Sequence, residues 1–169
     1  NELNPNGTTA GVERTGGLRA YYMGCAVFDG GTMKGVLSGR DTEIILMAKG
    51  MFHAGRITLH HEGGEGHMVL LLKGGGTPKV ELSIEGDAPY AKMGVRLQCH
   101  IECGEEDMDY NKWSQEVKPM LEDYMERELE RVFTLCRGLN SDAYEIGKYA
   151  AMMFHSVEDW EQYDWKSRY

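Results

Sequence analysis

The segment CHIEC carries two of the four cysteines of this chain, Cys99 and Cys103, and cysteine is suited to metal and disulfide chemistry. Both fall on one face of a predicted strand, about 13 Å apart at about 3.3 Å per residue, whereas the Cα atoms of a disulfide lie about 5.5 Å apart. His100 points to the other face, so the segment does not predict a zinc site. We expect all four cysteines to be buried thiols, but pairing of Cys25 with Cys99 or Cys103 across the sheet stays open.

A second group of metal-binding residue types flanks a glycine-rich segment: His60, His61, Glu62 and His67. Adjacent residues of a strand point to opposite faces, and the glycines that follow indicate a turn. We interpret this group as the solvated tip of a hairpin, and we predict no bound metal.

Motifs of catalysis and phosphate binding are missing from the sequence. The segment EGGEGH lacks the strand-to-helix step and the lysine or threonine of a phosphate loop, and no serine stands in a G-x-S-x-G pattern. The acidic residues are scattered over predicted helix faces. We therefore expect no enzyme activity, no catalytic residue and no cofactor, while the ligand-binding residues stay unknown.

Composition and charge restrict the class of protein. With 169 residues, 41% of them hydrophobic, the chain is long enough for one domain with a core. A net charge of -9, from 27 acidic and 18 basic residues, argues against a nucleic-acid partner. The longest apolar runs, IILMA and MVLLL, fall far short of the roughly 18 residues that span a bilayer. Residues 1–17 have the composition of a linker or disordered tail, so we expect a domain over residues 18–169, cut from a longer protein.

Hydrophobic periodicity then predicts the elements. Strand patterns cover residues 18–28 and 33–37, around an Asp-Gly-Gly turn, and a helix with a broad apolar face follows Asp41. We expect Phe28, Leu37 and Ile101 to share one interior. Further strands are predicted over residues 56–60, 67–73, 79–85 and 90–102, separated by glycines.

The last predicted strand has a core face and a polar face, as in an antiparallel sheet with one wet side. The core face carries Met93, Val95, Leu97, Cys99, Ile101 and Cys103. The period then changes to 3.6, which predicts a long helix with an apolar stripe from Trp113 to Cys136 and a favourable Asp123 to Arg127 pair. Because Pro119 lies inside this pattern, the helix either begins close to the proline or is kinked there. The fold class is α+β: an antiparallel or mixed sheet of about four to six strands, with a long helix and shorter helices packed on one face.

The stretch GCAVFDGGTMKGVLSGRDT resembles the start of the C-terminal domain of the spore germination protein C family, the lipoprotein C subunits of nutrient germinant receptors. The shared pattern is a strand with AVF, a turn, a return strand with G-x-L-[ST]-G and a helix start. Here these positions are Ala26, Val27, Phe28, Gly35, Leu37, Gly39 and Thr42.

The end of the chain, SDAYEIGKYAAMMFHSVEDWEQYDW, is similar to the closing pattern of the same family. It places Ser141, Asp142, Gly147, Trp160 and Trp165. The family commonly has a proline before the first of these tryptophans, and here the segment reads His-Ser-Val. Residues 56–92 match in pattern only.

The resemblance implies a non-enzymatic extracytoplasmic domain that acts through protein contacts in spore germination. Its implied partners are the integral-membrane A and B subunits of the receptor, and its implied place is the outer face of the spore inner membrane, held by an N-terminal lipid outside this chain. Two alternatives stay open: a domain that binds a small nutrient germinant, and a spore-wall hydrolase with two carboxylates in a cleft.

Four aromatic residues near the C-terminus bear on which surface binds a partner. Trp160, Tyr163, Trp165 and Tyr169 are residue types that often anchor interfaces. The simpler interpretation, which we favour, is that the two tryptophans fold the terminal segment back onto the sheet or the long helix.

Overall fold

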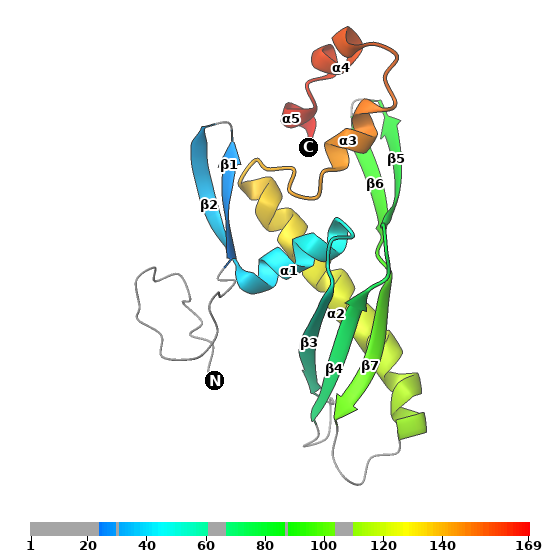
Figure 1. Ribbon diagram of the computed structural model, residues 1–169. Coiled ribbons are helices and arrows are strands. Elements are labelled where there is room, and N and C mark those ends of the chain that lie inside the picture. The colour runs from blue at the N-terminus through cyan, green and yellow to red at the C-terminus, as the bar shows by residue number, and fades with distance from the viewer. Residues whose placement is uncertain (1–23, 30, 61–66, 87, 104–109) are drawn as a thin grey trace.

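The computed structural model describes residues 24–29, 31–60, 67–86, 88–103 and 110–169 (Figure 1). Its strands are β1 Gly24–Asp29, β2 Thr32–Ser38, β3 Ala54–His60, β4 His67–Gly74, β5 Lys79–Glu85, β6 Ala88–Gly94 and β7 Leu97–Cys103. Its helices are α1 Gly39–Ala48, α2 Tyr110–Gly138, α3 Ile146–Ala151, α4 Val157–Tyr163 and α5 Trp165–Arg168. The paired strands are all antiparallel, which confirms the predicted α+β class. None of the described helices is long and apolar enough to cross a membrane.

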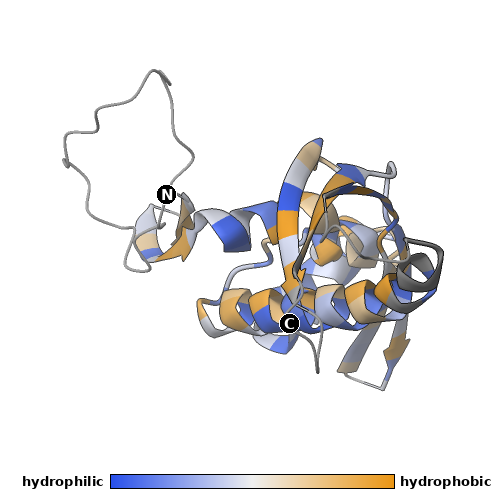
Figure 2. Cartoon of the chain, turned by 90° about the horizontal axis from the view of Figure 1, so that it is seen from below, coloured by the Kyte–Doolittle hydropathy of each residue, from blue (hydrophilic) through white to orange (hydrophobic). Residues whose placement is uncertain are grey.

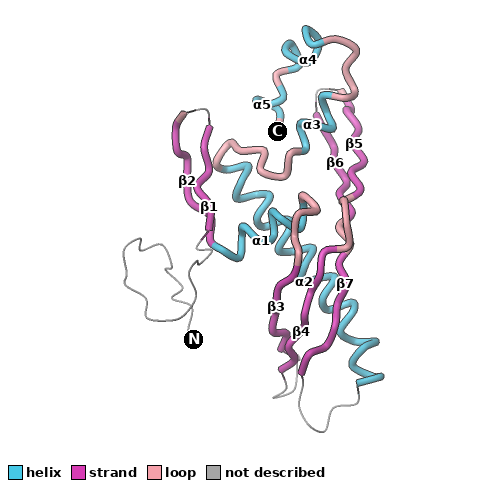
Figure 3. Tube along the Cα trace, in the orientation of Figure 1, coloured by secondary structure: helices cyan, strands magenta, loops and turns pink. Residues whose placement is uncertain are grey.

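The described strands form three hydrogen-bonded groups where one sheet was expected. These are β1 with β2, the order β3-β4-β7, and β5 with β6. Figure 3 shows that β5 and β6 continue the ribbon of β4 and β7 beyond a bend. The strand predicted over residues 90–102 is therefore divided into β6 and β7, with Val95 and Arg96 between them.

The bend depends on two glycines in the segment that leads from β4 to β5. The amide of Gly75 donates to the carbonyl oxygen of Arg96 at 2.9 Å, and a Cβ at Gly75 would lie 2.5 Å from that oxygen. Gly76 has φ +101°, a conformation that side chains rarely adopt. Between the two ladders, residues 75–78 lie opposite only Val95 and Arg96, so regular pairing cannot continue across the bend.

The β1–β2 hairpin leads into α1 through a capping box. The side chain of Ser38 accepts from the amide of Asp41, and the Asp41 carboxylate accepts from the amide of Ser38. Val27 and Leu37 of the hairpin are buried. Phe28 is 57% exposed, so the expectation that it shares the interior of Leu37 is wrong. The pairing register shifts between Val27 and Phe28, which places the phenylalanine on the solvent side.

Helix α2 is the central element of the core. Its buried residues lie four or seven positions apart, on one face of the helix: Val117, Leu121, Met125, Val132 and Cys136. Helix α1 crosses α2 (Figure 1), and both belong to one apolar cluster with Met68, Leu70 and Leu72 of β4. In Figure 2 apolar and polar residues alternate in bands along the helices, as expected where one face is buried. Each fully buried aliphatic side chain contributes about 1.5–3 kcal/mol.

Two predictions for the long helix have clear outcomes. The helix runs through Pro119, beginning nine positions earlier at Tyr110, so the proline does not mark its start. The Asp123 to Arg127 pair is formed, at 2.8 Å between Oδ2 and Nη2. Both side chains are exposed, so this pair contributes no more than about 0.5 kcal/mol.

A hydrogen-bonded carboxylate joins α1 to α2. Asp41 Oδ1 accepts from Arg131 Nη2 at 2.6 Å, and Arg131 also binds Glu128 one turn earlier. Burial raises the pKa of the Asp41 carboxyl, but hydrogen bonds from Ser38 and Arg131 outweigh burial and bring its pKa below the usual value of 3.8. The ionised form is therefore favoured in the folded protein.

The closing segment is held onto α2 by a carboxylate, a glycine and aromatic rings. Asp142 accepts from the amides of Ile146 at 2.9 Å and Gly147 at 2.5 Å. A Cβ at Gly147 would lie 2.8 Å from both Asp142 Oδ2 and Trp165 Nε1, so only glycine leaves room for the indole. This contact explains why the closing pattern contains these three residues together.

The terminal aromatic residues fold back as we favoured. Tyr169 packs edge-on against Phe133 of α2, with ring centroids 5.5 Å apart, and Trp165 contacts Tyr169 at 5.6 Å. Trp160 stacks at 6.1 Å on Trp165 and is half-buried. The last turns of the chain thus extend the apolar core that packs against α2.

Replacing Gly147 by alanine is expected to lower the free energy of unfolding by about 1–3 kcal/mol, because the new methyl group overlaps the Asp142 carboxylate and the Trp165 indole. Urea denaturation followed by tryptophan fluorescence measures the change. The matched control is Gly138→Ala, where a Cβ meets nothing within 4 Å and alanine is expected to be neutral or slightly stabilising. Equal stability of Gly147→Ala and the parent would contradict the packing described.

Asp41→Asn is expected to lower the free energy of unfolding at pH 7 by about 1–2 kcal/mol, since the charged hydrogen bonds from Arg131 are weakened. The folded pKa of Asp41 is depressed, so its stabilisation is present above the unfolded pKa of about 3.9 and is lost as the pH falls through the folded value. Urea denaturation at pH 7 and pH 3 measures this difference, which is expected to shrink at the lower pH. The exposed control Asp123→Asn is expected to change stability by no more than about 0.5 kcal/mol. A difference between Asp41→Asn and the parent that is the same at both pH values would refute the assignment.

Candidate functional site

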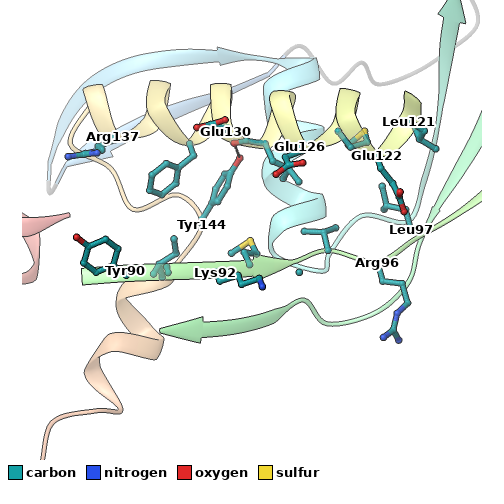
Figure 4. Close-up of a pocket in the computed structure, with 18 of the residues that line it drawn as sticks. Tyr90, Lys92, Arg96, Leu97, Leu121, Glu122, Glu126, Glu130, Arg137 and Tyr144 are labelled. Atoms are coloured by element: carbon teal, nitrogen blue, oxygen red, sulfur yellow. Dashed lines mark hydrogen bonds between the residues drawn. The ribbon is translucent and has the colours of Figure 1, made fainter. Parts of the chain in front are cut away.

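An open groove of about 1270 Å³ runs between α2 and the strands β6 and β7 (Figure 4). One wall is the apolar stripe of α2, which continues from the core through Leu129 to Phe133. The other wall comes from alternate residues of the strands: Met93, Val95, Leu97, Cys99 and Ile101. Most of these strand side chains are half-buried, because one side of each contacts the core and the other side faces the open groove.

The alternation predicted for the strand accounts for which side chains face the groove. Met93, Val95, Leu97 and Ile101 pack against the core cluster, which confirms the predicted inner face at these four positions, whereas Cys99 is exposed. The polar residues between them are exposed, and Figure 4 shows the side chain of Arg96 pointing away from α2. The strand wall of the groove is therefore apolar.

A row of glutamates borders the groove along α2. Glu122, Glu126 and Glu130 follow one another at four-residue intervals, so they share one side of the helix about 6 Å apart. Glu122 lies 3.9 Å from Lys118 in an exposed pair, and in the described part of the chain Glu126 and Glu130 make no ion pair. Like charges at this spacing destabilise a helix by about 0.2–0.5 kcal/mol per pair.

The groove is closed at one end by the C-terminal aromatic residues. Tyr144 donates its hydroxyl proton to the carbonyl of Leu129 at 2.7 Å. Trp165 Nε1 and Tyr169 Oη are buried and have no hydrogen-bond partner among the described residues. Burial raises the pKa of Tyr144 and of Tyr169 well above the usual value, so both phenols are neutral donors at physiological pH. This end of the groove offers hydrogen-bond donors beside an apolar trough.

The cysteines do not follow the expectation of four buried thiols. Cys25, Cys99 and Cys136 are free, so the disulfide left open by the sequence, from Cys25 to Cys99 or Cys103, is not formed. Cys136 is fully buried, and burial raises its pKa to about 11, with smaller contributions from Cys25 and Asp41. Cys99 lines the groove and is exposed. The surrounding apolar side chains still remove part of its solvent, and this desolvation raises the pKa of its thiol. The side chain of Cys103 lies outside the described residues.

The histidine group lies partly outside the described residues. His60 and His67 are backbone partners at the end of the β3–β4 hairpin, and His61 and Glu62 fall in the segment that is not described. The residues described contain no group of three or more histidine, cysteine or acidic side chains able to hold a metal ion. The hairpin position agrees with the interpretation as a hairpin tip.

The groove itself was not among the predicted sites. Its signal in the sequence is the row of glutamates at 122, 126 and 130 beside the apolar stripe of the long helix. Sequence alone places both apolar faces inside the protein, but it does not give the distance between α2 and the strands. The opening between the two walls is therefore a tertiary property.

Fold and groove define an α+β domain with an open, largely apolar surface between a long helix and a bent hairpin. The family model described as "Spore germination B3/ GerAC like, C-terminal" matches residues 23–169. The chain belongs to this spore germination family.

Comparison with solved structures supports the same fold. The structure described as "Crystal Structure of the GerBC protein" matches with a TM-score of 0.64 at 14% sequence identity. The match covers 80% of this chain and 42% of that one, so the chain spans about two fifths of the solved protein. A search of curated proteins gave no match.

Native-state alkylation is expected to label Cys99 and to spare Cys136. The thiol of Cys99 is exposed in the groove, whereas that of Cys136 is completely buried on the inner face of α2. The rate at Cys99 is expected to rise between pH 8 and pH 10, since burial raises its pKa and only the thiolate reacts. Iodoacetamide labelling, cleavage at glutamates and mass spectrometry separate the sites. Equal labelling of Cys99 and Cys136 in the folded protein would show that the groove is not open as described.

Proposed function

We propose that this chain is the extracytoplasmic C-terminal domain of the lipoprotein C subunit of a nutrient germinant receptor, required for spore germination and acting through protein contacts. The observation that carries the proposal is the family match over residues 23–169, which includes both signature segments. Support also comes from the groove, whose apolar walls are the kind of surface that proteins use for association.

The proposed role is non-enzymatic. Two polar side chains of the closing segment hold the fold: Asp142 accepts from two backbone amides and Tyr144 donates to a backbone carbonyl. A spore-wall hydrolase needs one carboxyl group kept protonated in an apolar environment, opposite a second one. Glu122, Glu126 and Glu130 are all exposed and lie on one helix, which does not favour that chemistry.

The partners we propose are the integral-membrane A and B subunits of the receptor. The domain would lie at the outer face of the spore inner membrane, held by a lipid on an N-terminal part of the protein outside this chain. Residues 1–17 would serve as a linker or tail, and residues 18–169 as the domain. The net charge of -9 fits association with proteins better than with nucleic acid.

A second candidate function is the binding of a small nutrient molecule. It is favoured by one observation: the unpartnered donors Trp165 Nε1 and Tyr169 Oη lie at the closed end of a largely apolar groove. Pockets for small ligands combine apolar walls with a few converging polar groups. The volume of about 1270 Å³ is larger than such ligands need, so the first proposal is preferred.

Purification of the full-length protein from crosslinked spore inner membranes is expected to recover two integral-membrane receptor subunits. Spores whose protein lacks residues 110–169 are expected to lose the response to the nutrient of that receptor, because α2 carries the core of the domain. Calorimetric titration of the purified chain with amino-acid and sugar germinants is expected to give no saturable heat. Saturable heat that Tyr169→Phe weakens would favour the second candidate, and a protein that purifies alone from spores with normal germination of the deletion strain would refute the first.

A further inference from the structure

We propose that the groove between α2 and the strands β6 and β7 is the docking site of an amphipathic helix from another receptor subunit, whose basic edge lies against Glu122, Glu126 and Glu130. The assignment of the partner to the receptor rests on the proposed function. The assignment of the occupant's chemistry rests on the walls, the charges and the backbone geometry of the groove itself.

The two walls match each other in length and in character. From Val117 to Phe133 the helix wall extends about 24 Å at about 1.5 Å per residue. From Met93 to Ile101 the strand wall measures about 26 Å along the chain at about 3.3 Å per residue, and the bend at Val95 and Arg96 makes the straight distance shorter. The groove is thus long enough for four or five helical turns of an apolar stripe, and its half-buried side chains are covered only when such a stripe is present.

The charges of the groove select a basic occupant. Three glutamates follow the mouth of the groove along α2, and two of them, Glu126 and Glu130, make no ion pair within the described ranges. The basic residues that contact the groove from α2, Lys118 and Arg137, lie towards its two ends. Because like charges on successive turns repel one another, a row of lysines or arginines on the occupant would relieve this repulsion while it adds attraction.

The side chains of the strand wall that face α2 are uncharged. Its groove-facing residues are Met93, Val95, Leu97, Cys99 and Ile101. Lys92 and Arg96 belong to the other face of the strand by alternation, and Arg96 points away from α2 in Figure 4. The side chains that face each other across the groove are therefore acidic on the helix side and uncharged on the strand side, while Lys92 and Arg96 border the groove from the outer face of the strand and Arg168 borders its closed end.

A helix suits this groove better than an extended segment. Both walls consist of side chains, from the face of a strand and from a helix whose backbone is already hydrogen-bonded. β6 and β7 are outer strands of their sheets, so an extended segment could pair with their free edges. It would then lie in the plane of the sheet beside the strand, and an extended segment placed between the strand face and α2 would leave its buried amides and carbonyls unsatisfied. A helix satisfies its own backbone groups and presents an apolar stripe, as in other helix-in-groove complexes.

The experiment uses the full-length lipoprotein in spore membranes, with a photo-crosslinking amino acid at Glu126 and, in a control strain, at Arg127, which is exposed on a different side of α2. Crosslinks from position 126, and not from 127, are expected to reach a receptor subunit in a peptide with helical apolar spacing and basic residues along one edge. Mass spectrometry of the crosslinked peptide identifies that segment.

A charge-reversed variant provides the quantitative test. Glu126→Lys with Glu130→Lys is expected to reduce recovery of the crosslinked subunit about tenfold and to weaken its dependence on salt, because the attraction becomes repulsion. The control, Glu81→Lys with Glu85→Lys on the outer strand β5, makes the same change in net charge away from the groove and is expected to bind normally. Urea denaturation establishes that both variants are folded.

The outcomes separate this inference from the proposed function. If receptor subunits are recovered but the groove variant binds as well as the control, or position 127 crosslinks in place of 126, the docking site is wrong and the receptor role stands. A crosslink from position 126 to a second copy of this chain would overturn the proposed helix from another subunit and make the second copy the occupant. Loss of the groove crosslink on addition of a nutrient alone would overturn it in favour of the nutrient. If the unaltered protein recovers no receptor subunit, the proposed function and the inference both fail.

Discussion

Burial of one face of α2 is the constraint on which the rest of the structure depends. Val132 and Cys136 are completely buried, and α1 and β4 supply the apolar side chains that cover them. A two-stranded hairpin is at best marginally stable alone, so β1–β2 and β5–β6 depend on this shared interior for their stability. The charged link from Asp41 to Arg131 fixes how α1 crosses the long helix, and contributes less than the apolar contacts beneath it.

Both signature segments act through the same helix. In the opening segment, Leu37 is buried and Thr42 donates to the carbonyl of Ser38, which fixes the start of α1. In the closing segment, the contact of Gly147 with Trp165 brings Tyr169 onto Phe133 of α2. The closing segment thereby covers α2 at one end of the groove, while the rest of the groove wall, towards β6 and β7, stays open.

Local features were predictable from the sequence, and features that depend on distant contacts were not. The strand over residues 79–85 has its predicted bounds, and the predicted capping side chains before α1 make their hydrogen bonds. Most of the inner face of the strand after Tyr90 packs on the core. The bend in that strand depends on a contact between Gly75 and Arg96, and the exposure of Phe28 depends on a register shift in the hairpin. The groove depends on the spacing of two apolar faces that sequence patterns place in the interior without a distance between them.

Hydrogen exchange of backbone amides measures most directly whether α2 forms one cooperative unit with α1 and β4. The amides from Val117 to Cys136 are expected to exchange only through global unfolding, at the same free energy as those of α1 and β4, while β5 and β6 open locally at lower cost. Exchange of the α2 amides before those of α1 and β4 would contradict a shared interior, and with it the account of how the two signature segments build this domain.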